Sequence, residues 1–199
     1  MNPEKPFSQA CENNQAPIFT HLARLFSDRQ QVLEVGSGTG QHAVYFGERL
    51  PHLTWQTSDL PENHAGIKLW LDDYPGSNLR PPLAFNVNGQ WPALTVDGLF
   101  TANTLHIMSW ASVQQFFAGL PGLLAPGALL VVYGPFNYGG QFTSDSNARF
   151  EQWLKSTDPE RGIRDFEAVC ELATGVGLTL LEDNPMPANN RLLVWRYQD

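Results

Sequence analysis

A carboxylate and three glycines stand at alternate positions in the first quarter of this sequence: Glu34, Gly36, Gly38 and Gly40. The apolar residues around Glu34 indicate a short buried strand before this turn, and residues 41–49 indicate a helix after it. A strand, a Gly-rich turn and a helix together bring the free N–H groups and the positive dipole end of the helix to the mouth of a sheet. We therefore expect a nucleotide pocket at the carboxyl end of the first strand.

The spacing of the glycines distinguishes between classes of nucleotide. A dinucleotide fingerprint needs its third glycine at position 41, which is Gln41. A carboxylate at the lip of the turn would repel a pyrophosphate, but it suits the ammonium group of S-adenosylmethionine, which carries no phosphate. The pattern resembles motif I of the class I methyltransferases, and the cofactor-binding candidates in it are Glu34, Gly36, Ser37, Gly38 and Gly40. The alternative is a turn whose glycines serve tight packing alone.

A second carboxylate, Asp59, follows the next predicted strand, which spans residues 53–57. An acid at this place in an open α/β sheet lies beside the first Gly-rich turn and can accept hydrogen bonds from both ribose hydroxyls. The alternative is an N-cap for the helix that begins at Pro61, a position that aspartate also favours. Because Asp59 occurs together with Glu34 and the glycines, we favour the ribose role.

The third predicted strand, residues 83–87, ends with Asn86 and Val87. In class I methyltransferases a polar side chain at this place accepts a hydrogen bond from the adenine N6 amine, and the next backbone N–H serves N1. The resemblance therefore makes both residues cofactor-binding candidates. An asparagine that initiates a turn explains the position almost as well.

Three polar residues follow or end the fourth and fifth predicted strands, 96–102 and 128–133: Asn103, His106 and Tyr133. The carboxyl ends of these strands share a rim with the cofactor turn, so the three side chains are expected to face a common cleft. Asn103 is a further cofactor-binding candidate. His106 is a catalytic candidate, as a base or as a group that orients an acceptor, although a lone histidine more often caps a turn or packs. Tyr133 is the second catalytic candidate, as a proton carrier or a wall residue.

Hydrophobic periodicity predicts the elements that must position these residues. A first helix is expected from Pro17 to Phe26, after a polar and irregular segment. Further helices are expected from Pro61, at 113–120, around 150–154 and at 165–175, and a long Pro/Asn loop joins two last strands at 178–181 and 192–195. Six βα-like alternations and a closing strand pair predict a single domain over residues 1–199. Its fold is a doubly wound, Rossmann-like α/β sheet of seven strands of the class I methyltransferase type, with the last strand antiparallel.

The composition excludes several classes of protein. The 199 residues carry 20 acidic and 12 basic side chains, and the net charge of −8 argues against nucleic-acid or anionic-membrane partners. No apolar run reaches the ~18 residues of a membrane span, and the first residues lack the apolar region of an export signal, so a cytoplasmic protein is expected. Cys11 and Cys170 are too few for a disulfide framework. No His/Cys cluster has zinc spacing, so no metal is expected.

Longer segments of the chain resemble the DUF938 family, whose animal branch is called methyltransferase-like protein 26. The matching segments cover nearly the whole chain: Phe7-Ser8, Asn14 with Pro17-Ile18, 33–42, 103–107 with Trp110, 133–136, Ser144 with Ser146-Asn147 and Phe150, 162–165, and 186–190. The family resembles S-adenosylmethionine-dependent methyltransferases, and the resemblance implies no particular acceptor. The chain departs from it in two places: members tend to carry Asp where Asn86 stands, and basic residues where Asn13 and Gln15 stand.

We interpret the sequence as a class I methyltransferase that methylates a small molecule or a protein side chain. Methyl transfer is an in-line displacement, so it requires alignment of the reactants more than a catalytic dyad. Glu34 would take the methionine end of the cofactor, Asp59 the ribose and Asn86 the adenine, while residues 136–147 would close over the acceptor. The alternatives are a non-catalytic S-adenosylmethionine-binding protein or partner subunit, and a nicotinamide-dependent oxidoreductase, which Gln41 disfavours.

Overall fold

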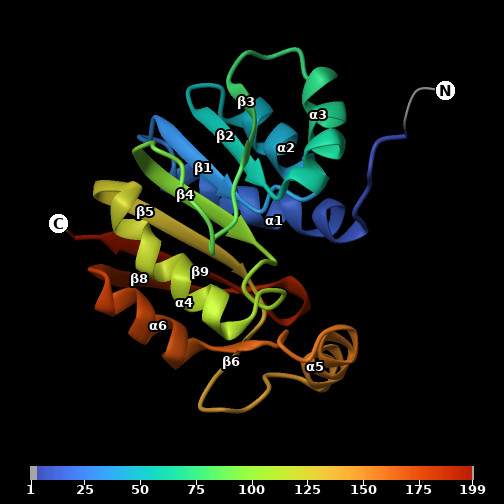
Figure 1. Ribbon diagram of the computed structural model, residues 1–199, viewed down its shortest axis with the longest axis vertical. Helices are drawn as coiled ribbons and strands as arrows, with labels where there is room; N and C mark the ends of the chain where they lie inside the picture. The colour runs from blue at the N-terminus through green and yellow to red at the C-terminus, as the bar shows by residue number, and fades with distance from the viewer. Residues whose placement is uncertain (1–3, 199) are drawn as a thin grey trace.

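The computed structural model describes residues 4–198, and in them seven strands form one sheet in the order β3-β2-β1-β4-β5-β9-β8 (Figure 1). The strands are β1 (Gln31–Val35), β2 (Thr54–Asp59), β3 (Leu79–Ala84), β4 (Val96–Ala102), β5 (Leu124–Gly134), β8 (Leu178–Met186) and β9 (Asn190–Tyr197). Neighbouring strands are parallel from β3 along the sheet to β5, whereas β9 is antiparallel to both of its neighbours, β5 and β8. The prediction of a doubly wound sheet with an antiparallel last strand is confirmed. Two short strands, β6 (Phe136–Asn137) and β7 (Arg164–Asp165), pair separately.

The strand order places β1 between β2 and β4, where the direction of winding reverses. At such a switch point the connections leave to opposite faces of the sheet and create a crevice outside the carboxyl ends of the strands. In the register of the sheet, Glu34 lies opposite Thr57 on β2 and Phe100 on β4. The turn after β1 therefore lies at the same edge as the ends of β2 and β4.

Helices cover both faces of this sheet, namely α1 (Gln9–Leu25), α2 (Gln41–Arg49), α3 (His64–Asp72), α4 (Trp110–Gly119) and α6 (Phe166–Gly175), and a further helix is α5 (Asp145–Thr157). α1 and α2 pack on one face around Phe46 and Trp55, and α4 and α6 pack on the other around Phe116 and Trp195. Because both faces are covered, most of β1, β4 and β5 is buried. α5 lies beyond the sheet, past the strand ends (Figure 1). Within residues 4–198, no helix has the length and apolar character to span a membrane.

The first helix is longer than the prediction. α1 begins at Gln9 instead of Pro17, and Ser8 caps it by accepting a hydrogen bond of 3.3 Å from the backbone N–H of Cys11. Pro17 lies inside the helix, although proline is most at home in the first turn. The first two turns have no apolar stripe because the residue that they bury is Asn14, which is polar. Hydrophobic periodicity therefore misses them.

The third strand ends earlier than predicted, at Ala84, so that Asn86 and Val87 follow the strand instead of ending it. β3 is an edge strand, and an edge strand tolerates prolines because one row of its backbone groups has no partner strand. Pro81 and Pro82 are therefore part of β3, whereas the sequence pattern placed them before it.

The last two strands are longer than predicted. β8 runs to Met186 and β9 begins at Asn190, so the expected long loop is a short turn, Pro187–Asn189. β8 forms the other edge of the sheet, and much of it is exposed. Its second half is consequently polar and lacks the apolar alternation by which a strand is recognised.

Candidate functional site

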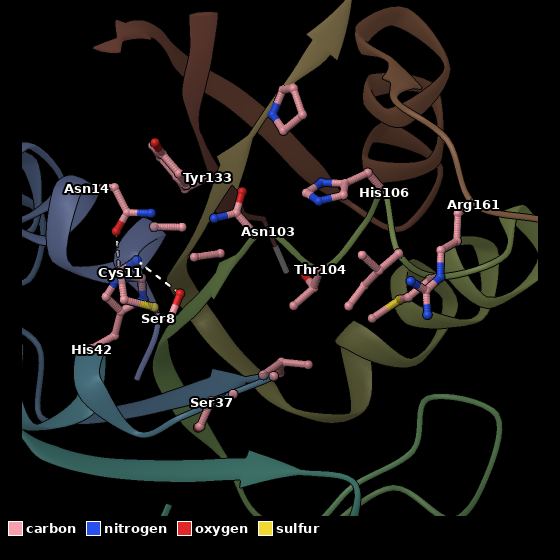
Figure 2. A pocket seen from close by; sticks show the side chains of 18 of the residues that line it. Ser8, Cys11, Asn14, Ser37, His42, Asn103, Thr104, His106, Tyr133 and Arg161 are labelled. Carbon is pink, nitrogen blue, oxygen red and sulfur yellow. Dashed lines mark hydrogen bonds between the residues drawn. The ribbon is translucent and has the colours of Figure 1, made fainter. Parts of the chain in front are cut away.

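A cavity of about 1210 Å³ lies at the carboxyl ends of the strands (Figure 2). It is bounded by the loops that follow β1 to β5, by α1 and by α5. Nine of the predicted site residues line it: Gly36, Ser37, Gly38, Asp59, Asn86, Val87, Asn103, His106 and Tyr133. The other two, Glu34 and Gly40, do not line it.

The Gly-rich turn leaves open space for a ligand at one position. Gly36 and Gly38 both have positive φ, 76° and 59°, which glycine adopts without steric cost. A Cβ on Gly36 would lie 2.5 Å from Cγ2 of Thr104, so this glycine allows the loop after β4 to approach. A Cβ on Gly38 would meet nothing within 4 Å. The backbone at Gly38 therefore borders open space in the cavity.

Gly40 does not line the cavity and has a clear role in packing, and its role in cofactor binding stays a prediction. It begins α2 with φ of 93°. A Cβ there would lie 3.1 Å from Cα and 3.2 Å from the carbonyl oxygen of Ile67 on α3. The close approach of α2 to α3 therefore requires glycine at this position.

The structure buries Glu34 beneath the turn instead of placing it at the lip, and its role at the methionine end of the cofactor stays a prediction. Its side chain is buried, and Oε2 accepts hydrogen bonds from Oγ of Ser37 at 2.9 Å and Nε1 of Trp55 at 3.1 Å. Burial raises the pKa of Glu34 to about 7, the two hydrogen bonds oppose this shift, and the negative charge of Asp59 adds to it. Ser37 Oγ in turn accepts from the N–H of Ser58. Glu34 thus supports the turn from beneath.

The carboxylate of Asp59 joins two neighbouring segments of the chain. Its Oδ2 accepts a hydrogen bond of 2.7 Å from the N–H of Gly38, which joins the end of β2 to the Gly-rich turn. Its Oδ1 accepts from the N–H of Leu60 at 2.7 Å and from Nδ2 of Asn63 at 2.8 Å, which ties the end of β2 to the following segment without capping its helix, whose N-cap is Leu60. Asp59 also lines the cavity, and its role toward the ribose stays a prediction.

Asn86 forms the turn that was the alternative to a ligand role. Its Oδ1 accepts a hydrogen bond of 2.9 Å from the N–H of Asn88, as in an Asx turn. The carbonyl of Val87 accepts from Nε1 of Trp91. Both residues line the cavity together with Phe85. A role in adenine binding stays a prediction.

Asn103 holds a strained backbone at the end of β4. Its φ is 56°, in the left-handed region that non-glycine residues rarely adopt, and its N–H donates to the carbonyl of Tyr133 at 2.9 Å. Strain of this kind persists where surrounding contacts enforce it, and it is concentrated at functional sites. The side chain of Asn103 projects into the middle of the cavity (Figure 2).

His106 is a buried, neutral imidazole at the cavity wall. Its ring packs edge-on against Phe150 at 5.3 Å between centroids, and its carbonyl accepts from the N–H of Gly162. Burial lowers the pKa of His106 to about 4, and the positive charges of Arg164 and Arg161 lower it further. His106 therefore combines a packing contact with a position in the site.

Tyr133 stands at the end of β5, near α1 and the turn before β9. Burial raises the pKa of its phenol, whereas hydrogen bonding with Asn190 and Asn14 lowers it. All three residues line the cavity.

Sequence reasoning missed the contribution of α1. Ser8, Cys11 and Asn14 all face the cavity, and His42 of α2 contacts Oδ1 of Asn14 through Nε2 at 2.6 Å (Figure 2). Burial lowers the pKa of His42 to about 4. Sequence reasoning also missed Arg161, which lines the side of the cavity opposite α1. The resemblance to DUF938 marked Ser8 and Asn14 as matching residues, but it gave them no role.

Comparison with known proteins places the fold and the family. A family model described as "Protein of unknown function (DUF938)" matches residues 5–197. An O-methyltransferase family protein from Burkholderia thailandensis superposes with a TM-score of 0.84 at 16% identity, over 96% of this chain and 58% of that one. A putative O-methyltransferase from Nostoc punctiforme gives 0.81 at 14% identity, over 94% and 56% of the two chains.

A third structure is human N-acetylserotonin methyltransferase, solved in complex with SAM. It gives a TM-score of 0.79 at 14% identity, over 96% of this chain and 53% of that one. The chain thus spans little more than half the length of each of these three proteins. At such low identity the likeness shows the fold alone, which is the Rossmann-like fold of S-adenosylmethionine-dependent methyltransferases.

Proposed function

Because this chain belongs to the DUF938 family and has a class I methyltransferase fold, we propose that it is an S-adenosylmethionine-dependent methyltransferase acting on a small molecule or a protein side chain. The observation that carries the proposal is the hydrogen bond between Gly38, whose backbone borders open space in the cavity, and the carboxylate of Asp59. Gly38 borders open space, and its N–H holds Asp59 at the same edge of the cavity.

The charges in the cavity suit a cationic nucleoside better than a phosphate ligand. Phosphate sites at Gly-rich turns collect N–H groups and cations. Here the N–H of Gly38 is already taken by Asp59. Of the described residues, the cavity lining includes no lysine and one arginine, Arg161, which Figure 2 places on the opposite side from Ser8 and Cys11. This supports S-adenosylmethionine over a nicotinamide dinucleotide.

In the proposed site each residue has a definite task. Asp59 accepts hydrogen bonds from the ribose hydroxyls, Asn86 and Val87 border the adenine, and Gly36, Gly38 and Asn103 border the methionine end. Glu34 holds the turn through Ser37. When bound, S-adenosylmethionine supplies an electrophilic methyl group.

The chain contributes alignment and exclusion of water around that group. His106 and Tyr133 lie across the cavity from the Gly-rich turn, at the ends of β4 and β5, so we propose that they contact the acceptor. His106 can orient an acceptor hydroxyl or amine through its neutral ring.

Both cysteines, Cys11 and Cys170, are free thiols, which supports a site of action in the reducing cytoplasm.

Calorimetric titration with S-adenosylhomocysteine and with NADH tests the proposal. We expect saturable binding of S-adenosylhomocysteine and none of NADH; the reverse would identify an oxidoreductase and contradict the proposal. Transfer of a labelled methyl group across a panel of metabolites and proteins then separates an enzyme from a non-catalytic binding protein.

The net charge of −8 supports the proposal that the acceptor is not a nucleic acid. Tight, salt-sensitive RNA or DNA binding would contradict that part.

A further inference from the structure

Arg161 is a cation in the cavity whose side chain has no partner among the residues that the structure describes. It lines the cavity, and its Nε is buried with no hydrogen-bond partner. Within residues 4–198, no carboxylate forms an ion pair with it, and its recorded hydrogen bonds all involve its backbone. Buried polar groups are nearly always paired, so one that is left unpaired requires an explanation.

The neighbouring Arg164 shows what a structural arginine looks like in the same segment. Its guanidinium donates to the carbonyls of Leu105 at 3.1 Å, of Glu160 at 3.0 Å and of Met108. These bonds tie the loop after β4 to the segment after α5. Arg161 has no such function, although it lies three residues away.

The position of Arg161 is nevertheless fixed by its backbone. Its N–H donates to the carbonyl of Asp158 at 3.0 Å, and the N–H of Gly162 donates to the carbonyl of His106 at 3.0 Å. The N–H of Ile163 donates to Oε2 of Glu151 at 2.6 Å. The guanidinium is therefore presented from a rigid turn on the same side of the cavity as His106 (Figure 2).

The wall beside Arg161 is aromatic and apolar. Phe150 and Trp153 are stacked at 5.7 Å with 12° between their planes, and Phe150 also meets His106. Trp153 is 57% exposed although it lines the cavity, and Ile107, also a lining residue, is 46% exposed. Aromatic faces of this kind bind planar apolar groups by offset stacking and area burial.

The size of the cavity leaves room for a second ligand. Pockets that enclose one drug-sized ligand have volumes of roughly 300–1,000 Å³. This cavity has about 1210 Å³ and reaches from Asp59 to Arg161. Two carboxylates, Asp158 and Glu160, line the rim near Arg161, but Oδ1 of Asp158 accepts from the N–H of Glu160, and neither pairs with Arg161.

Resting on the proposed function, we propose that the methyl acceptor is a small aromatic carboxylic acid whose carboxylate pairs with Arg161. A guanidinium offers two parallel N–H donors that match the two oxygens of a carboxylate. The carboxylate would supply the partner that Nε lacks, and the ring of the acid would lie against Phe150 and Trp153.

Ligand-observed NMR on the protein loaded with S-adenosylhomocysteine tests this inference. The probes are benzoate, cinnamate and naphthoate, each compared with its primary amide, which has the same shape but no charge. We expect binding of at least one acid and at least tenfold weaker binding of its amide, because a charge-assisted pair is lost. We expect Arg161→Gln to weaken the acid by a similar factor, and Arg161→Lys, which keeps the charge but not the fork, by less.

The matched control is Arg149→Gln, which removes the same charge from an exposed arginine of α5 that does not line the cavity. We expect this variant to bind the acids as the parent does. Equal binding of acids and amides, no binding of any acid, or full binding by Arg161→Gln would overturn the inference while the cofactor site stands. Failure of the parent protein to bind S-adenosylhomocysteine would instead overturn the proposed function.

Discussion

The backbone N–H of Gly38 donates a hydrogen bond of 2.7 Å to Oδ2 of Asp59. This bond joins the turn after β1 to the end of β2, two segments separated by the whole of α2. It fixes the carboxylate where the Gly-rich turn borders the cavity. The cofactor end of the proposed site is therefore held together by a contact between its two best sequence candidates.

Substitution of Asp59 should impair cofactor binding. We expect Asp59→Ala to weaken S-adenosylhomocysteine by roughly tenfold to a hundredfold in calorimetry, because about 1.5–3 kcal/mol of charge-assisted hydrogen bonding is lost. Asp97→Ala is the matched control: that carboxylate accepts from the N–H groups of Gln30 and Gln31 at the start of β1. It should cost stability and leave affinity unchanged. Equal affinities for Asp59→Ala and the parent would remove the ribose assignment.

The glycines of the turn should separate into a packing position and a binding position. Gly40→Ala forces a Cβ against the backbone of α3 at positive φ, so we expect the free energy of unfolding to fall by about 2–4 kcal/mol. Gly38→Ala meets no protein atom and should cost only about 1–2 kcal/mol for its backbone conformation, yet it should reduce S-adenosylhomocysteine affinity. Urea unfolding and calorimetry measure the two effects. Similar destabilisation by both variants would contradict this division.

Glu34 should make the protein less stable as pH rises. Its pKa is raised from 4.5 to about 7 in the folded state, so the folded protein holds this proton more tightly than the unfolded chain between these values. The free energy of unfolding should therefore fall across this window, by up to about 3 kcal/mol at about 1.4 kcal/mol per pKa unit. Glu34→Gln keeps an acceptor for Ser37 and Trp55 but cannot titrate.

Urea unfolding of the ligand-free parent and of Glu34→Gln at pH 5 and pH 8 isolates this contribution, because the other titrating groups are common to both. We expect the parent to lose stability relative to the variant between the two values. A constant difference would mean that Glu34 is not buried as a neutral acid near pH 5.

The two buried histidines should remain neutral throughout the physiological range. Burial lowers the pKa values of His42 and His106 to about 4. Their ring protons should therefore show no titration in NMR between pH 5.5 and 8, whereas the unfolded chain in urea should titrate near 6.5. Since the folded pKa lies below the unfolded one, each histidine should reduce stability as pH falls from about 6.5 to 4. A His106 midpoint near 6.5 would contradict its burial and revive a charged role.

The features that could be predicted from the sequence are local ones. The apolar run before Gly36, the glycines themselves and the acid after the second strand lie close together in sequence or end a recognisable element. The position of Glu34 could not be predicted, because it depends on the register that brings Trp55 of β2 against it. The role of Gly40 depends in the same way on α3, an element that lies two dozen residues further on.

The acceptor side of the cavity was hidden for a further reason. Asn14 and Arg161 are polar residues in segments without apolar periodicity. They line opposite sides of one cavity only because α1 and the segment after α5 fold over the same edge of the sheet. In the sequence alone, neither residue can be distinguished from a polar residue on the protein surface. The segments that resemble the DUF938 family include Asn14 and residues 162–165, and the structure shows that Asn14 and Arg161, which directly precedes residues 162–165, line the cavity.

A crystal structure of the complex with S-adenosylhomocysteine is the most direct test of the central claim. We expect the ribose hydroxyls within hydrogen-bond distance of Asp59, the purine against Phe85 to Val87, and the amino-acid end between Gly36 and Asn103. The space beside Arg161, Phe150 and Trp153 should remain free of the nucleoside. Density for S-adenosylhomocysteine away from Asp59, or none at saturating concentration, would contradict the account.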